Sequence, residues 1–347
     1  MSADNHKPIE LPLDEFDPQR LTIGATTPCW LTAPVGLTGP VRLPALVTRG
    51  SRPGTTTLLV AGVHGDEFEG VAAVPALTGQ LNPADMSGTL IAISVCNPFA
   101  FSAQSRTSPA HIDGANLARE FPGDPTGTPT QRLAAALFTL ATRLLGPDDL
   151  LVDLHSAGTK YRYMMLAGFR DFDGPARQAS ENAARHFATP AGARLWSIWP
   201  QRGMFNSETT LAGIPTVACE APGQGRCRQQ DVTAYTDGLL NLLRHQRMIP
   251  GEPPESNGAP PACPTELYAP CDGLLITDVE PGDQVALGQP LARITDAFGE
   301  DRAEIRAPHA GEIWAIRTFA SVYANEYVLW LARSGSTPSL VNPRGRD

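Results

Sequence analysis

Apolar segments of strand length alternate with amphipathic segments of helix length between residues 55 and 248, and this alternation limits the folds open to the chain. Strands alternating with helices predict an α/β fold with a mainly parallel, mixed sheet that carries helices on both faces. Ligands of such sheets bind beyond the carboxyl ends of the strands, so polar residues at those ends are the candidates for chemistry. The expected strands cover residues 41–47, 55–60, 89–96, 150–154, 163–166, 195–198 and 216–219, and the expected helices residues 67–77, 131–145, 176–187 and 232–248.

A Pro- and Gly-rich stretch at residues 250–262 predicts a linker. It divides the chain into a domain of residues 1–249, whose first fifty residues form an N-terminal β segment, and a β domain of residues 263–347. Short strand patterns alternate with turns after the linker. The pattern GDQVALGQPL at residues 282–291 resembles the barrel-sandwich module of biotinyl and lipoyl carrier domains. Those domains attach their cofactor to a lysine, and no lysine follows Lys160, so a structural or pocket-rimming role is expected instead.

The composition is that of an ordinary globular protein, with 42% hydrophobic residues among 347. A formal net charge of -9 argues against nucleic acid or an anionic membrane as the main partner, because both attract a positive surface. Neither a secretory leader nor a membrane-spanning apolar run is found. We therefore expect a cytoplasmic protein with no membrane partner, in which six scattered cysteines are reduced and self-association into a homo-oligomer is allowed for.

A histidine follows each of two expected strands. His64 and Glu67 follow the first strand in a His-x-x-Glu spacing, and His155 lies at the end of a second strand in DLHS. His, Glu and His from neighbouring strand ends supply the three protein ligands that a catalytic zinc requires, with one position left open. The alternative for the first pair is a capped helix start, and for His155 a hydrogen-bonded core histidine. Two such strand ends together favour the metal site.

Other candidate groups lie where hydrolysis needs them. Glu220 follows a third strand, where a carboxylate can take a proton from water and return it to a leaving amine, although a surface acid is the plain alternative. The long loop between the two histidine segments carries Arg106 and Arg119. One arginine can stabilise an oxyanion and the other can hold a substrate carboxylate, unless both are solvated surface charges.

The ordered motifs of the chain resemble those of the succinylglutamate desuccinylase/aspartoacylase family, a branch of the zinc carboxypeptidase-like fold. The motifs are Gly-x-His-Gly-x-Glu, Arg-Thr-Ser-Pro, Asp-Gly-x-Asn-Leu-x-Arg-x-Phe-Pro-Gly, Asp-Leu-His-Ser and a late Glu before Gly-x-Gly, within residues 55–225. Several motifs in the right order are far more specific than any one of them. A β module after the linker is also usual in that family.

The resemblance implies one Zn²⁺ per chain and assigns roles to eight residues. Two departures from the family pattern concern the substrate: Ala118 stands where an Asn usually precedes the anchoring Arg, and the segment from Pro109 to Asp113, which contains His111, is longer than the usual Pro-Ile-Asp. The implied roles are zinc ligation by His64, Glu67 and His155, general base and acid for Glu220, carbonyl polarisation by Arg106, anchoring of a substrate carboxylate by Arg119, and shaping of the substrate pocket by Asp113 and Asn116.

We therefore expect a zinc-dependent amidohydrolase that removes an acyl group from a small N-acylated amino acid or related amine. Deacetylation of N-acetyl-diaminobutyrate is one substrate that the resemblance suggests. A metallocarboxypeptidase acting on peptide-like substrates is the closest alternative, because the same site geometry serves both reactions. A non-catalytic metal-binding protein on the same scaffold and a purely structural α/β domain are the alternatives from other classes.

Overall fold

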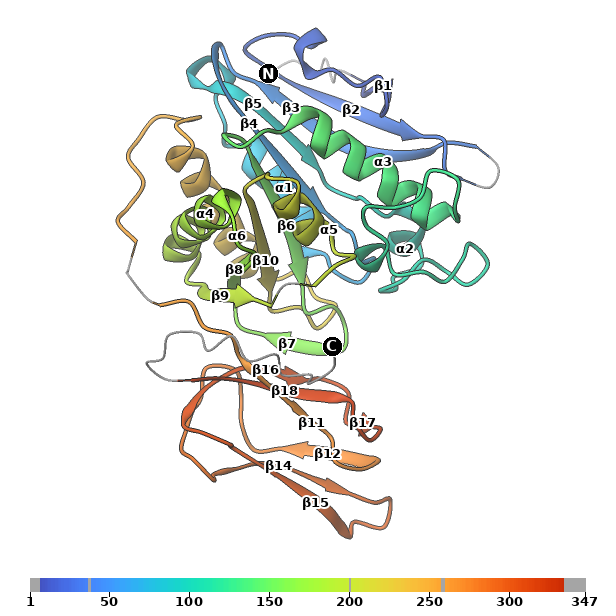
Figure 1. Ribbon diagram of the computed structural model, residues 1–347, viewed down its shortest axis with the longest axis vertical. Helices are drawn as coiled ribbons and strands as arrows, with labels where there is room; N and C mark the ends of the chain where they lie inside the picture. The colour runs from blue at the N-terminus through green and yellow to red at the C-terminus, as the bar shows by residue number, and fades with distance from the viewer. Residues whose placement is uncertain (1–6, 37–38, 200, 257–259, 334–347) are drawn as a thin grey trace.

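The computed structural model describes residues 7–36, 39–199, 201–256 and 260–333, so the ends of the expected N-terminal segment, linker and C-terminal domain lie partly outside it. A nine-stranded sheet forms the centre of the larger part (Figure 1). Its strands, in spatial order, are β1 (Ile9–Pro12), β2 (Ala25–Ala33), β3 (Val41–Arg49), β5 (Ser87–Ile93), β4 (Arg52–Ala61), β6 (Leu150–Ser156), β10 (Thr216–Ala221), β8 (Leu166–Arg170) and β9 (Arg194–Ile198).

The sheet is mixed. β4 pairs in parallel with β5 and β6, and β6 pairs in parallel with β10, whereas β3 runs antiparallel to both of its neighbours and β8 runs antiparallel to β10. The alternation of helices and strands thus predicts the parallel centre. It does not predict the antiparallel pairings, because β2 and β3 are joined without a crossover helix.

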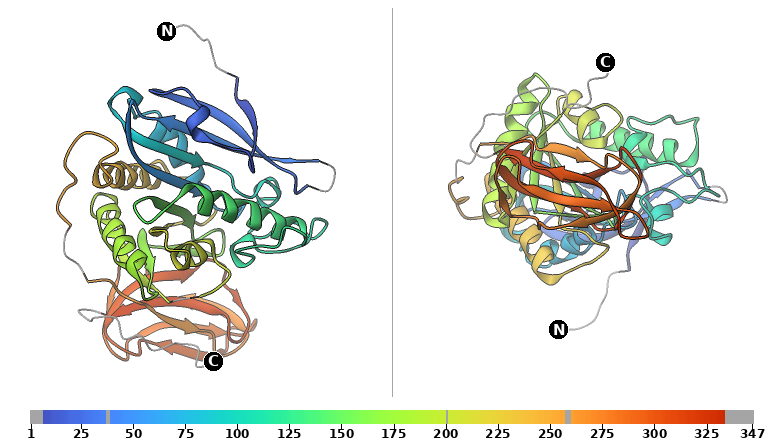
Figure 2. Two further views of the ribbon diagram at one scale, coloured as in Figure 1. Left: turned by 45° about the horizontal axis from the view of Figure 1, so that its top comes forward. Right: turned by 90° about the horizontal axis from the view of Figure 1, so that it is seen from below.

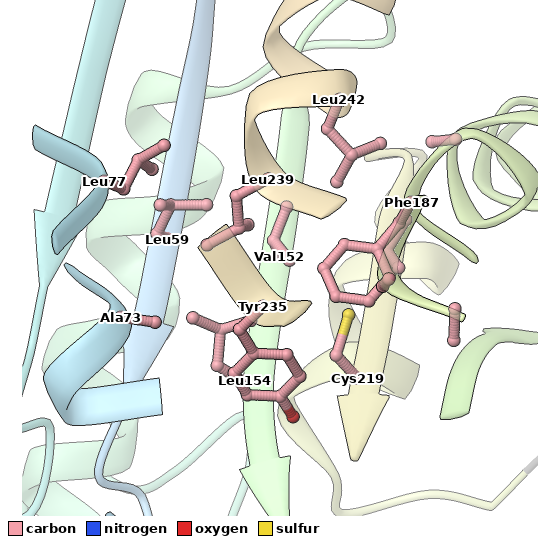
Figure 3. Close-up of a cluster of buried hydrophobic side chains, with 14 of the residues drawn as sticks. Leu59, Ala73, Leu77, Val152, Leu154, Phe187, Cys219, Tyr235, Leu239 and Leu242 are labelled. Carbon is pink, nitrogen blue, oxygen red and sulfur yellow. The ribbon is translucent and has the colours of Figure 1, made fainter. Parts of the chain in front are cut away.

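Helices cover both faces of this sheet. They are α1 (Glu69–Thr78), α2 (Pro98–Ser102), α3 (Pro129–Leu144), α4 (Pro175–Ala191), α5 (Phe205–Leu211) and α6 (Gln229–His245). α1, α4 and α6 pack on one face with Leu59, Val152 and Cys219 of the strands (Figure 3). α3 and α5 pack on the other face, with Leu58 and Val60. Alternate residues of β4 therefore feed two separate apolar layers, as strand geometry requires.

Local sequence signals set the ends of the longer helices. A capping box at Thr128 and Gln131, with Pro129 in the first turn, begins α3. Gly192 ends α4 in the left-handed conformation, at φ +65°. α1 begins at Glu69, later than residue 67, and its N-cap Phe68 makes no side-chain cap, so the alternative of a capped helix start for His64 and Glu67 is wrong.

The expected strand at residues 163–166 is also wrong. The segment forms two strands in different sheets: β7 (Tyr161–Tyr163) and β8. β7 pairs antiparallel with β16 of the C-terminal sheets, while β8 joins the large sheet. Apolar character continues through both strands, so the pattern alone does not mark the change of sheet.

After the linker the chain forms two antiparallel sheets that face each other around a separate apolar cluster. Seen from below, they lie over the end of the larger part (Figure 2). Their strands are β11 (Thr265–Tyr268), β12 (Gly273–Thr277), β13 (Gln284–Val285), β14 (Pro290–Thr295), β15 (Asp301–Arg306), β16 (Gly311–Arg317), β17 (Ser321–Val322) and β18 (Tyr327–Arg333).

In the described part of the chain, no helix has the length and apolar character needed to cross a membrane. All six cysteines are unpaired, and Cys29, Cys96 and Cys219 are buried.

Candidate active site

The site forms where β4, β6 and β10 end side by side. These three strands are neighbours and run parallel, so their carboxyl ends meet at one edge, which faces the C-terminal sheets in Figure 1. His64 and Glu67 lie in the turn that connects β4 to α1, His155 lies near the end of β6, and Glu220 lies near the end of β10. The predicted residues are thus brought together by parallel pairing.

His64, Glu67 and His155 form a buried cluster. Glu67 Oε1 lies 2.7 Å from Nδ1 of His64, and Oε2 lies 2.9 Å from Nδ1 of His155. One potential ligand atom from each residue lies within 4.8 Å of the other two. The three residues are only 2%, 3% and 8% exposed. This donor set and spacing fit one divalent metal ion, and His₂Glu is a set that zinc accepts in hydrolases.

The second nitrogen of each histidine ring also lies beside an oxygen atom, in a hydrogen bond for His64 and an ion-pair contact for His155. Nε2 of His64 is hydrogen-bonded to Asn116 Oδ1 at 3.0 Å, and Nε2 of His155 lies 3.1 Å from Asp153 Oδ1. These contacts direct both Nδ1 atoms toward Glu67, in the manner of outer partners that orient metal-binding histidines. Asp153 reaches the ring because residues two apart on β6 share a face of the sheet.

The cluster is strongly polarised. Burial by itself raises the pKa of Glu67, but His64 and His155 outweigh it and hold that pKa well below its usual value. Burial likewise opposes the charged form of His155, and the carboxylates of Asp153 and Glu67 raise its pKa well above the ordinary value. Burial lowers the pKa of His64. Glu67 is therefore ionised, as a metal-binding carboxylate must be.

Glu220 stands beside this cluster. It is directly opposite His155 in the parallel β10–β6 register, so both side chains leave the same face of the sheet. Burial raises the pKa of Glu220 well above its ordinary value, and the negative charges of Glu67 and Asp153 act in the same direction. Its Oε2 is buried without a hydrogen-bond partner. A carboxyl group with a raised pKa and a free oxygen is suited to exchanging a proton with a bound molecule.

The two loop arginines take different places. Arg106 reaches the cluster, with Nη1 donating to Glu67 Oε1 at 3.2 Å while 45% of its side chain is exposed. Arg119 is exposed and donates from Nη1 to the carbonyl oxygen of Ala118 at 2.8 Å. Burial lowers the pKa of Arg170 to about 9, and the positive charge of Arg119 acts in the same direction.

Asp113 and Asn116 hold the loop in shape. Asp113 accepts from the backbone N–H and the hydroxyl of Thr130, both at 2.7 Å, and so ties the loop to the start of α3. Asn116 Oδ1 accepts from the backbone N–H of Ala118 at 3.0 Å in addition to contacting His64. Ala118 is buried in the apolar cluster beneath the loop. His111, in the longer segment, is exposed.

Two acids beside Glu67 have structural roles that the motif alone does not reveal. Asp66 Oδ2 accepts from the backbone N–H and the hydroxyl of Thr159, both at 3.0 Å. Glu69 Oε1 accepts from the backbone N–H of Gly223 at 2.9 Å. The acids of the first motif therefore brace the turns that follow His155 and Glu220. This is why the turn after β4 is so polar.

Aromatic residues close the side of the site that faces the C-terminal sheets. Tyr161 stacks on Tyr327 at 4.6 Å between ring centroids, and Tyr163 stacks on Trp330 at 4.9 Å. β7 follows His155 by a few residues, so these contacts place β18 next to the edge of the sheet that carries His155. The aromatic pairs also join the two parts of the chain into one apolar cluster.

Comparisons with known proteins agree with this arrangement. Residues 53–246 match the Succinylglutamate desuccinylase/Aspartoacylase catalytic domain. An N-alpha-acetyl-L-2,4-diaminobutyric acid deacetylase from Halomonas elongata is 32% identical over 304 residues, which are 85% of this chain and 86% of that protein.

Solved structures of similar proteins span nearly the whole chain. The product-bound ectoine utilization protein EutE (DoeB) from Ruegeria pomeroyi has a TM-score of 0.79 at 27% identity, over 90% of this chain and 97% of that one. A succinylglutamate desuccinylase/aspartoacylase from Rhodobacter sphaeroides also has a TM-score of 0.79 at 27% identity, over 92% and 98% of the two chains. The chain belongs to the succinylglutamate desuccinylase/aspartoacylase family.

Proposed function

We propose that this protein is a zinc-dependent deacylase that hydrolyses the amide bond of a small N-acylated amino acid. The observation that carries the proposal is the buried His64, Glu67 and His155 cluster with Glu220 beside it in the β10–β6 register. Relatives with deacylase names support removal of an acyl group. The choice of zinc, the roles of individual residues and the zinc carboxypeptidase-like description of the fold are part of the proposal.

The cluster would provide three protein ligands to the metal, and catalytic zinc sites keep a further position open for water or substrate. Zinc at such a site lowers the pKa of bound water toward neutrality and polarises a substrate carbonyl. The chain supplies the remaining groups. Glu220 accepts the proton of the attacking water and later donates it to the departing nitrogen, a role that fits its raised pKa and its unpaired oxygen.

Arg106 and Arg119 bind the two ends of the substrate in this proposal. The partly exposed guanidinium of Arg106 lies at the edge of the cluster, where it can stabilise the negative charge that develops on the carbonyl oxygen. Arg119, on the loop beyond Asn116, is positioned to hold a carboxylate by a two-pronged contact. Both hold the substrate while Glu220 moves the proton.

An N-acetylated diamino acid is the first substrate to test. The Halomonas elongata relative is named as an N-alpha-acetyl-L-2,4-diaminobutyric acid deacetylase, and the Ruegeria pomeroyi structure is of an ectoine utilization protein. The stacked Tyr161 and Tyr327 set the C-terminal sheets against the catalytic edge, which favours small substrates over long peptides. A pocket-rimming role for those sheets, their barrel-sandwich resemblance, the domain division at residues 250–262 and a cytoplasmic location remain predictions.

The test is release of a primary amine from N-acetyl, N-succinyl and N-formyl amino acids and from short peptides, with zinc-loaded protein and the Glu220→Ala variant as the blank. Turnover of one acylated amino acid, absent in the variant, supports the proposal and identifies the acyl group. Cleavage restricted to peptides would instead establish a metallocarboxypeptidase. Bound zinc with no turnover of any compound would favour a binding protein.

A further inference from the structure

Arg170, at the end of β8, is a buried arginine whose donors are divided among three acceptors. Its Nε donates to Asn206 Oδ1 at 2.7 Å, its Nη1 donates to the carbonyl oxygen of Trp199 at 2.8 Å, and its Nη2 contacts the sulfur of Met204. Only 5% of the residue is exposed. A guanidinium group is costly to bury unless its charge and donors are matched, so the position requires an explanation.

Asn206 connects Arg170 to a neighbour of His155. The Nδ2 group of Asn206, on the first turn of α5, donates to Asp153 Oδ2 at 2.8 Å. The other oxygen of Asp153 lies 3.1 Å from Nε2 of His155. Arg170, Asn206, Asp153 and His155 thus form a continuous line, and none is more than 8% exposed. The amide of Asn206 has one favourable orientation, because its oxygen faces a cation and its nitrogen faces a carboxylate.

The charges at the two ends of the Arg170–Asn206–Asp153 contacts are opposite. Burial and the nearby Arg119 lower the pKa of Arg170 to about 9, while Asp153 and Glu220 oppose that shift. Arg170 therefore remains positively charged at neutral pH. The positive charge of Arg170, on the far side of Asn206, compensates the carboxylate of Asp153, which is only 1% exposed. The Asp153 carboxylate also makes an ion-pair contact with His155.

Arg170 also contacts a residue beside the Arg119 loop. Its partner Met204 directly follows Gly203, and the carbonyl oxygen of Gly203 accepts from the backbone N–H of Phe121 at 3.1 Å. A side chain at Gly203, which has φ +85°, would approach the carbonyl oxygen of Arg119 to 2.8 Å. One buried arginine thus contacts both the support of His155 and the segment packed on the Arg119 loop.

We propose that Arg170 is a positioning residue for the metal site: acting through Asn206 and Asp153, it fixes the ring of His155 with Nδ1 directed at Glu67. The inference rests on the proposed function, since it assumes that the cluster binds zinc. Outer partners of metal-binding histidines contribute about 10–100-fold to metal affinity, and this is the expected effect. A purely structural role would instead lower stability and leave the zinc affinity of the folded protein unchanged.

The sharpest variant is Asn206→Asp, because it preserves size and the acceptor for Arg170 but replaces the donor to Asp153 with a second carboxylate. Arg170→Met and Asp153→Asn break the line at its other members. Arg177→Met is the matched control, since Arg177 pairs with Asp171 and Glu181 instead. The measurements are zinc affinity by competition with a chromogenic chelator and the Tm of each metal-free protein.

We expect zinc affinity to fall about 10–100-fold in Asn206→Asp, Arg170→Met and Asp153→Asn, and to stay unchanged in Arg177→Met. The double variant Asp153→Asn/Asn206→Asp restores a donor facing an acceptor at that contact. It should therefore bind zinc more tightly than Asn206→Asp alone. Combining Arg170→Met with Asp153→Asn should add little to either single change, because both act through one contact line.

Three results would overturn the inference. They are wild-type zinc affinity in folded Arg170→Met or Asn206→Asp, additive losses in the Arg170→Met/Asp153→Asn variant, or no recovery in the exchange variant. If Arg170→Met does not fold, Asn206→Asp and the exchange variant decide the question. Failure of the wild-type protein to bind zinc would overturn the proposed function together with this inference, whereas zinc binding unaffected by the variants would overturn the inference alone.

Discussion

Replacing Glu220 with Gln separates catalysis from metal binding. Gln has the size of Glu but cannot take up a proton, so it removes the acid–base group with little change of shape. Because Oε2 of Glu220 accepts no hydrogen bond, the substitution removes no internal partner from that atom. We therefore expect the variant to keep its fold and the His64, Glu67 and His155 cluster, and so its zinc.

The expected loss is in turnover. General acid–base catalysis contributes about 10²–10⁴-fold, which corresponds to about 2.7–5.4 kcal/mol of transition-state stabilisation at about 1.36 kcal/mol per tenfold. The assay is kcat for the best N-acylated substrate, measured with metal content and Tm on the same preparations. A kcat within about threefold of wild type would refute the assignment of Glu220, and loss of zinc at unchanged Tm would show that Glu220 is a ligand instead.

Three further outcomes follow from the structure. His155→Ala should abolish stoichiometric zinc binding and turnover, checked by metal analysis after dialysis, whereas Glu220→Gln should not. Burial and the neighbouring His186 lower the pKa of His245 to about 4, so the folded protein resists protonation of this ring. The Tm should therefore fall as the pH is lowered from about 6.5 toward 4, and His245→Phe should reduce that fall. Gly238→Ala should destabilise the fold by about 1–3 kcal/mol in denaturant titrations despite its better helix propensity, because a new Cβ would lie 2.7 Å from the ring of Phe187.

The centre of the fold follows from sequence patterns because those patterns are local. Residues 55–60, 150–154 and 216–219 are short apolar runs, and they form β4, β6 and β10 with their carboxyl ends together. The sequence patterns do not predict α5, because its sequence FNSETTL is mostly polar. Five of its seven residues are nevertheless polar side chains that are buried in the structure. Asn206 is held there by hydrogen bonds with the distant Arg170 and Asp153, which hydrophobic periodicity does not record.

The cluster of His64, Glu67 and His155 was predictable for a related reason. Each of its histidines belongs to a short motif at a strand end, and parallel pairing converts separate motifs into one site. The same reasoning does not place Asn116: its motif suggests the substrate pocket, while its side chain contacts His64 Nε2. Loop geometry decides which atom a residue faces, and sequence spacing does not supply that geometry.

Arg170 and Asn206 left no signal in the sequence because their contacts join residues 36 and 53 positions apart. Neither belongs to a motif, and an arginine at the end of a strand ordinarily indicates a solvated surface charge. Their importance follows from a physical requirement instead. The carboxylate of Asp153 lies beside His155 and is only 1% exposed, and a buried carboxylate needs a compensating positive charge. In this fold Arg170, at the end of β8, supplies the positive charge. Asn206, in the first turn of α5, connects it to Asp153 by hydrogen bonds, which explains both the buried arginine and the polar residue of α5.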